Sequence, residues 1–129
     1  MRVVIEVPND PELLEALLEA VTGINATILS RVGEVMGEAP PLLYDTGIRY
    51  KREPAGREEW QTVLGNMARG LGDCEDLATH RAAELRVYDG EPARAVVRRT
   101  GPRTLHAVVE RADGTIEDPS KLLGMRRRG

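Results

Sequence analysis

The sequence predicts a single α+β domain in which helices come first and an antiparallel meander comes last. The length of 129 residues, 41% hydrophobic and 30% charged, suits one domain with one core. Apolar residues recur at helical spacing until about residue 87, whereas three short β-prone segments follow Gly90. Because the chain has no Phe, one Trp and three Tyr, we expect a mainly aliphatic core.

The N-terminal segment is predicted to form one strand and two helices. Residues 3–7 are a short β-prone run. Asp10 is suited to cap a helix that begins with Pro11, and leucines at helical spacing continue this helix until Gly23, where we expect it to end. A second helix is expected over residues 24–36.

The middle of the chain is predicted to be irregular and then helical. Pro40 and Pro41 interrupt any helix, and residues 40–58 are typical of an irregular connection. A connection of this length is unusual in a small domain and often lies near a functional site. From Trp60 the apolar residues recur at helical spacing, which predicts a short helix that ends at Gly70.

The last part of the chain predicts one more helix and three strands. Asp73 is suited to cap a helix that continues to about residue 87. Residues 93–99, 104–111 and 114–117 are expected to be strands, because they are β-prone and separated by turns that contain glycine.

The net charge disfavours a general nucleic-acid binder. The formal net charge is −3, whereas such proteins are usually basic. We expect the arginines of the second half to form a solvated strand face and a basic tail. A basic patch that binds nucleic acid is the alternative. These arginines are Arg94, Arg98, Arg99, Arg103, Arg126, Arg127 and Arg128.

Cysteine content and apolar runs predict the compartment. No apolar run approaches the roughly 20 residues that span a membrane, and the first residues do not resemble a signal peptide. The single cysteine, Cys74, excludes an internal disulfide and a multi-cysteine metal site. We therefore expect a cytoplasmic protein with no membrane partner, whose thiol is either a packing group or a nucleophile.

The position of Cys74 favours a nucleophile. It follows the predicted cap Asp73, in the first helical turn, where free backbone N–H groups and the helix dipole stabilise a thiolate. The carboxylates of Asp73, Glu75 and Asp76 oppose a thiolate. A protonated imidazole nearby would reverse their effect.

Two histidines are candidates for that imidazole. His80 lies on the same helix as Cys74 but faces another direction, so we expect it to pack or to lie at the surface. His106 lies within a strand among apolar residues, where it needs a polar partner, and a hydrogen-bonded core histidine is the alternative. Asp118 ends the next strand: a three-residue connection places it diagonal to His106 and a five-residue connection places it opposite, whereas a two-residue turn separates them.

Cys74, His106 and Asp118 supply a nucleophile, its base and the group that orients the base. A mononuclear metal site built from the same residues is the alternative. We expect no cofactor. The chemistry predicted for the three residues is attack by the thiol on an amide carbonyl.

An oxyanion hole is expected beside the thiol. The backbone N–H of Cys74 is one candidate donor. Trp60 and Gln61 are candidates for a second donor. Together with Asp73, they are also candidates for a substrate groove. The alternative for Trp60 is that it anchors the core.

Several sequence runs support this assignment through a resemblance. They are residues 72–78 (GDCEDLA), 105–109 (LHAVV) and 116–119 (IEDP), with 44–50 (YDTGIRY) and 59–61 (EWQ). Together they resemble the transglutaminase-like cysteine-enzyme superfamily, and within it the small bacterial and phage-encoded transglutaminase-like cysteine proteinases.

The resemblance covers residues 44–125, which would form the catalytic core. It implies a papain-like fold, with the cysteine helix packed on an antiparallel sheet that bears the histidine and the aspartate. Residues 1–43 would add an N-terminal strand and helices, and residues 126–129 a basic tail. A phage-encoded member would act in the host cytoplasm or the virion.

Three functions follow as hypotheses. The first is thiol-dependent acyl chemistry on a protein or peptide substrate, by hydrolysis or by transfer to an amine, with Cys74 alkylated well below the pH of an ordinary thiol. The second is a catalytically inactive binding or assembly module, for instance in phage particle assembly. The third is nucleic-acid binding through the arginines. The sequence leaves the oligomeric state open.

Overall fold

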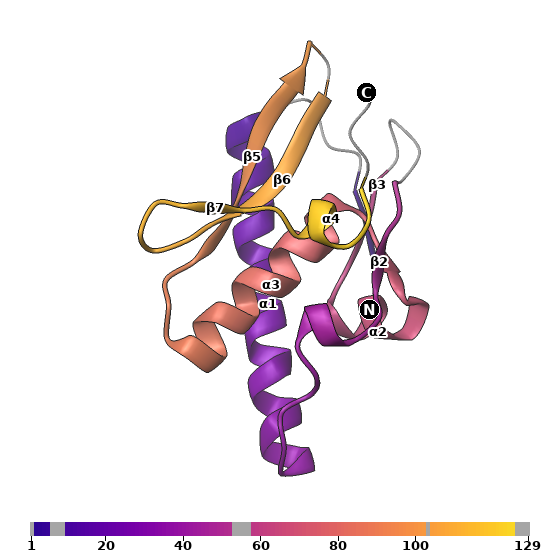
Figure 1. Ribbon diagram of the computed structural model, residues 1–129, viewed down its shortest axis with the longest axis vertical. Coiled ribbons are helices and arrows are strands. Elements are labelled where there is room, and N and C mark those ends of the chain that lie inside the picture. The colour runs from indigo at the N-terminus through magenta and orange to yellow at the C-terminus, as the bar shows by residue number, and fades with distance from the viewer. Residues whose placement is uncertain (1, 6–9, 53–57, 103, 126–129) are drawn as a thin grey trace.

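The computed structural model has an α+β fold, in which two long helices pack on a three-stranded antiparallel sheet (Figure 1). The helices are α1 (Pro11–Met36) and α3 (Cys74–Asp89), and the sheet has the order β5 (Arg94–Gly101), β6 (Thr104–Glu110), β7 (Ile116–Glu117). The structure describes residues 2–5, 10–52, 58–102 and 104–125.

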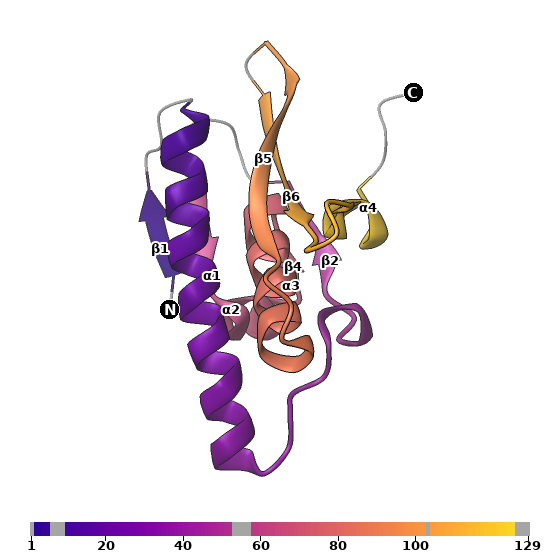
Figure 2. The same cartoon turned by 90° about the vertical axis from the view of Figure 1, so that its left-hand side faces the viewer.

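Two further sheets have two strands each. One pairs β1 with β3 antiparallel, and the other pairs β2 with β4 in parallel. The β5–β6 hairpin extends beyond the helices at one end of the molecule, and α1 extends at the other (Figure 2). The bounds of the shorter elements are β1 (Arg2–Ile5), η1 (Leu43–Asp45), β2 (Arg49–Tyr50), β3 (Glu58–Gln61), α2 (Val63–Arg69), β4 (Leu71–Gly72) and α4 (Pro119–Leu122).

The predicted meander is confirmed, and the other boundaries are confirmed in part. Helix α3 begins after Asp73, as expected, and ends at Gly90, whose φ of 63° is left-handed. Of the strand predicted over residues 3–7, β1 covers the beginning, and residues 6–9 lie outside the described part of the chain, as does the basic tail 126–129.

The prediction of two helices between residues 11 and 36 is wrong, because α1 is continuous. Gly23 lies inside it and does not end it. A glycine inside a helix costs only about 1 kcal/mol, whereas Leu18 and Leu29 on either side are fully buried and hold the helix on the domain. The helix ends at Gly37, where φ is 76°.

Gly23→Ala is expected to raise the free energy of unfolding by about 0.5–1 kcal/mol. Position 23 is exposed, and a Cβ placed there meets nothing within 4 Å, so the helix gains propensity without a clash. Urea unfolding measures the change. Gly37→Ala, at the left-handed end of α1, should lower the stability in the same assay. A loss of stability in Gly23→Ala would contradict a continuous α1.

The helix predicted from Trp60 begins three residues later, at Val63. Trp60 belongs to β3, where it pairs with Val3 of β1, and its side chain is only 2% exposed. A pairing partner so distant in sequence gives no local signal, so helical spacing was the stronger local pattern. Gly70, with φ of 70°, ends α2 as predicted.

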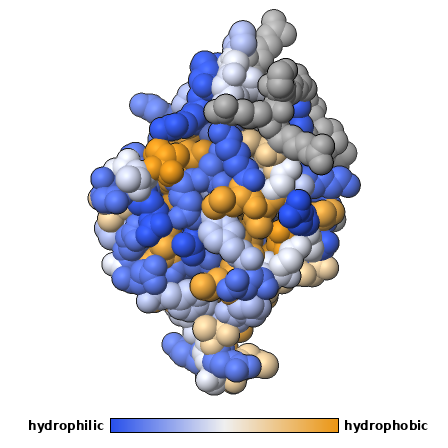
Figure 3. Space-filling view, viewed as in Figure 1, coloured by the Kyte–Doolittle hydropathy of each residue, from blue (hydrophilic) through white to orange (hydrophobic). Residues whose placement is uncertain are grey.

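Helix α1 is long enough and apolar enough to cross a membrane, judged by length and composition alone. The expectation that no segment would meet this criterion is therefore wrong. A core helix of a soluble protein passes the same test, and α1 packs on α3 and β5 through Leu14 and Leu18. On the face seen in Figure 3, hydrophobic side chains are scattered among hydrophilic ones.

Candidate active site

Cys74 is the first residue of α3, and two carboxylates fix the start of that helix. The Asp76 carboxylate accepts the backbone N–H of Asp73 at 3.1 Å, and Asp73 caps the helix in return. The Cys74 N–H, expected to serve as an oxyanion donor, donates to the Asp73 carboxylate at 2.7 Å. In this structure the expected donor is therefore already in use.

His106 and Asp118 form a direct pair. The register of β6 and β7 joins Val109 to Glu117, which leaves a three-residue connection that includes Gly114 at φ 87°. Asp118 is then the diagonal neighbour of His106, and the distance from His106 Nε2 to Asp118 Oδ2 is 2.9 Å. Of the registers that the sequence left open, the three-residue connection is the one observed.

The Asp118 carboxylate is held from two sides. Its Oδ1 accepts the Lys121 N–H at 3.3 Å, which caps α4, while Oδ2 faces His106. Burial raises the pKa of Asp118, but the hydrogen bonds from His106 and from the Lys121 backbone lower it more, so the carboxyl stays ionised. Because a carboxylate only accepts, His106 Nε2 carries the proton, and Nδ1 is the nitrogen that can act as a base.

The thiol of Cys74 packs against β6 at Ala107, the residue that follows His106 in the chain. Cys74 is 7% exposed and shares the main core cluster with Ala107. The backbone N–H of Ala107 and the carboxylate of Glu75 are its hydrogen-bond partners in the described part of the chain. The structure thus brings the sulfur to the residue that follows His106, and no described hydrogen bond joins it to the imidazole.

The thiol is protonated in the chain without substrate. Burial raises the pKa of Cys74, and Glu75 and Asp73 raise it further, which the Ala107 N–H does not offset. The expectation that the helix start favours a thiolate is therefore wrong for this state. A helix dipole contributes only about 0.3–1 kcal/mol at a surface, whereas burying an unpaired ion costs several kcal/mol.

Glu75→Gln is expected to move the pH profile of Cys74 alkylation to lower pH. The variant removes the carboxylate that both accepts from the thiol and repels a thiolate. The midpoint of iodoacetamide reactivity against pH measures this shift. Glu110→Gln, on the exposed Arg94–Glu110 ion pair, is the matched control and should leave the midpoint in place. An unchanged midpoint in Glu75→Gln would show that the Glu75 carboxylate does not contribute to the raised thiol pKa.

Trp60 and Gln61 hold the scaffold around the start of α3. Trp60 lies in the core cluster, so the core-anchor alternative is what the structure shows. The Gln61 N–H donates to Asp76 Oδ1 at 2.8 Å, and its side-chain amide donates to the Leu71 carbonyl at 2.9 Å. These bonds join β3 and β4 to the helix that carries the nucleophile.

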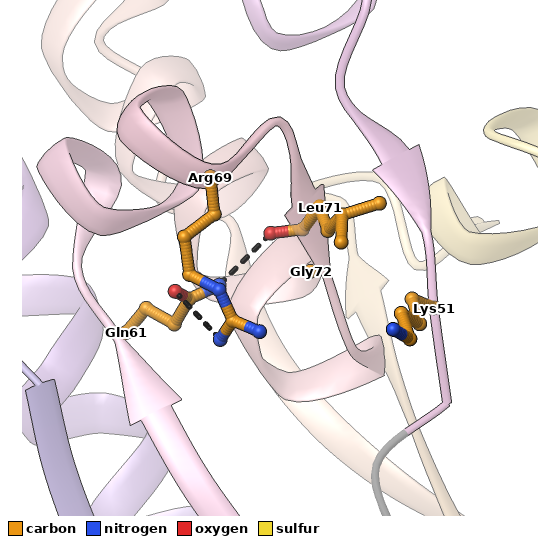
Figure 4. A pocket seen from close by; sticks show the side chains of 5 residues that line it. All are labelled: Lys51, Gln61, Arg69, Leu71 and Gly72. Carbon is orange, nitrogen blue, oxygen red and sulfur yellow. Dashed lines mark hydrogen bonds between the residues drawn. The ribbon is translucent and has the colours of Figure 1, made fainter.

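A shallow pocket lies beside this scaffold (Figure 4). In it Arg69 Nη1 donates to Gln61 Oε1 at 3.3 Å, and the Lys51 N–H donates to the Gly72 carbonyl at 2.8 Å. Two of the residues that line the pocket, Lys51 and Arg69, are cationic, and they lie close to the start of α3. It is lined by Lys51, Gln61, Arg69, Leu71 and Gly72.

Tyr50 also belongs to the site, although the sequence did not assign it a role. The parallel pairing of β2 with β4 places Tyr50 beside Gly72, and the ring packs against the core cluster of Cys74. Burial, and then the charge of Asp73, raises the pKa of Tyr50 to about 12. The length of the connection over residues 40–58 and the resemblance of residues 44–50 were the signals for it.

His80 is a packing residue, one of the two roles expected for it. Its side chain is fully buried, and its Nδ1 lies 3.1 Å from the Asn66 amide nitrogen. Burial lowers the pKa of His80 to about 4, so the ring is neutral at pH 7.

The sequence left two alternatives open, a metal site and a basic patch. The atoms that could share an ion in the described part of the chain belong to Asp73, Cys74 and Glu75, not to the histidine pair. Arg94 is paired with Glu110 at 3.0 Å. Arg103 and the tail 126–129 lie outside the described residues.

No protein-family model, curated protein or solved structure matches this chain. The interpretation of the site therefore depends on its own residues and geometry.

Proposed function

We propose that this chain carries out thiol-dependent acyl chemistry on amide bonds of a protein or peptide, as a cysteine hydrolase or acyltransferase. The observation that carries the proposal is the His106–Asp118 pair at 2.9 Å, on the strands next to which Cys74 begins its helix. Cys74 is the nucleophile, His106 the base, and Asp118 the group that orients the base.

The first half of the reaction forms a thioester. The Cys74 sulfur attacks the amide carbonyl while its proton passes to His106 Nδ1, because burial raises the pKa of the thiol and the thiol therefore needs a base. Asp118 stabilises the imidazolium through Nε2. The C–N bond then breaks, and the imidazolium gives its proton to the leaving amine.

The second half removes the acyl group from Cys74. Water or a primary amine attacks the thioester carbonyl, and His106 accepts one proton from the attacking group. The C–S bond breaks, and the proton returns to the sulfur. The product is a carboxylic acid when water attacks and a new amide when an amine attacks.

The same proposal includes the transglutaminase-like assignment, with its papain-like core and cytoplasmic location. What supports it is the order of elements: a helix that begins with cysteine, then a strand with histidine, then a strand that leads to aspartate. Helix α3 packs on β6, and α1 covers β5.

Casein with hydroxylamine as the amine acceptor tests the proposed function. We expect Cys74-dependent hydroxamates or new cleavage products, detected by mass spectrometry. Cys74→Ala and wild type are compared at equal concentration, with circular dichroism to confirm that both are folded. Casein that stays unmodified with wild-type protein, as with Cys74→Ala, would contradict the proposal.

The burial of the thiol favours a second candidate, a binding or assembly module without activity. Cys74 is 7% exposed and its pKa is raised, which suits a packing group. On this hypothesis Cys74→Ala leaves complex formation or particle yield at the wild-type level. Loss of assembly in that single variant would exclude it.

A further inference from the structure

Glu117 and Asp118 are neighbours with opposite orientations. Successive side chains of a strand point to opposite faces, so Asp118 faces His106 while Glu117 turns toward the helices. The Glu117 carboxylate accepts three hydrogen bonds: from the Tyr44 hydroxyl, from Arg81 Nε at 2.7 Å and from Arg111 Nη1 at 2.9 Å. Only 15% of the side chain is exposed.

These bonds are needed because β7 is held weakly by its backbone. It pairs with β6 through Val109–Glu117 and Glu110–Ile116, the Arg111 N–H adds one bond to the Thr115 carbonyl at 2.8 Å, and β7 lies at an edge of the sheet. Hydrogen bonds in which the donor or the acceptor is ionised are about twice as strong as neutral ones. The three bonds to Glu117 therefore contribute much of the stabilisation that holds β7 against the rest of the domain.

The partners of Glu117 join β7 to the helix of the nucleophile. Arg81 follows Cys74 by seven residues on α3, close to two full turns, so both residues lie on the same face of the helix. Tyr44 comes from η1, and the Arg81 guanidinium lies 5.0 Å from the centre of its ring. Arg111 is held in turn by Glu91, at 2.6 Å.

We propose that Glu117 is a positioning residue, which fixes β7 against α3 and thereby sets Asp118 at the distance where it orients His106. The effect on catalysis rests on the proposed function, whereas the effect on His106 does not. Glu117 touches no reacting atom in this account. It acts through Asp118, so the measurement that reports its role is the tautomer of the His106 imidazole.

The test compares Glu117→Gln with Glu110→Gln, a matched loss of one carboxylate from the Arg94–Glu110 ion pair of the same sheet. ¹⁵N shifts report the His106 tautomer, and His106→Ala identifies its signals among the two histidines. We expect wild type and Glu110→Gln to hold the Nε2–H form, and Glu117→Gln to give a mixture. Casein turnover should fall about 10-fold in Glu117→Gln alone, because displaced catalytic groups lose rate.

Tyr44→Phe removes one donor and is the milder variant if Glu117→Gln does not fold. It should shift the tautomer in the same direction by a smaller amount. A folded Glu117→Gln, or in its place a folded Tyr44→Phe, with the wild-type tautomer would overturn the proposal. A changed tautomer without any casein turnover in wild type would support the positioning role and contradict the proposed function.

Discussion

His106→Ala is expected to lower the rate of amide turnover by about 10⁴-fold, the scale on which losing the base of a nucleophilic triad acts. The raised pKa of Cys74 makes the base essential, because the thiol must give up its proton during attack. The imidazole is only 13% exposed, so the variant also loses packing around the His106–Asp118 pair. Rates of casein modification measure the loss, and circular dichroism confirms that the variant is folded.

Asp118→Asn and Arg98→Gln complete this series. The asparagine keeps an oxygen for the Lys121 N–H but no longer stabilises the imidazolium; the base itself remains, so turnover should fall by less than in His106→Ala. Arg98 is exposed and lies opposite His106 in the register of β5 and β6. Arg98→Gln is therefore the control, and it should leave turnover near the wild-type rate. Equal rates in wild type and His106→Ala would exclude His106 as the base.

Asp76→Ala is expected to lower the free energy of unfolding by about 3 kcal/mol, because it leaves two buried backbone N–H groups without an acceptor. These groups belong to Gln61, at 2.8 Å, and Asp73, at 3.1 Å. Their loss would release β3 from the start of α3. Urea unfolding at pH 5 measures the change, with Asp89→Ala at the exposed end of α3 as the control.

The ionisation of Asp76 adds a pH dependence. Burial raises its pKa from 3.8 to about 7, despite the backbone donors that oppose the shift. The stability from this raised pKa is complete below about pH 4 and is lost as the pH rises through 7. From pH 5 to pH 8 the wild type should lose about 3 kcal/mol relative to Asp76→Asn. A constant difference between the two proteins would contradict the raised pKa.

The sequence was most informative where structure depends on neighbouring residues. Asp73 caps α3 and Gly70 ends α2, because caps and left-handed glycines act within one helical turn. The pairing of His106 with Asp118 follows from the length of one connection, which includes Gly114. The α+β class and the order of the last strands were predictable for the same reason.

Contacts between distant segments account for most of what was missed. Trp60 belongs to a strand because β1 pairs with it, and Gly23 stays helical because α1 packs along the domain. Neither pairing nor packing has a signal within a short window. Glu117 gave no signal either, since its partners Tyr44 and Arg81 come from other parts of the chain.

The protonation state of Cys74 was missed for a related reason. The sequence shows Glu75 and Asp73 beside the thiol, and it correctly indicates that they oppose a thiolate. It does not show burial, which depends on how α3 packs on β6 and has the largest effect on the pKa. A helix start alone therefore does not predict a reactive thiol.

Detection of an acyl group on Cys74 tests the central claim most directly. Wild-type protein is mixed with casein peptides, quenched in acid and analysed by intact-mass and peptide mass spectrometry. The account predicts a thioester on Cys74 that hydroxylamine removes and that is absent from His106→Ala. Absence of any acyl adduct on wild-type Cys74, with the peptides left intact, would contradict it.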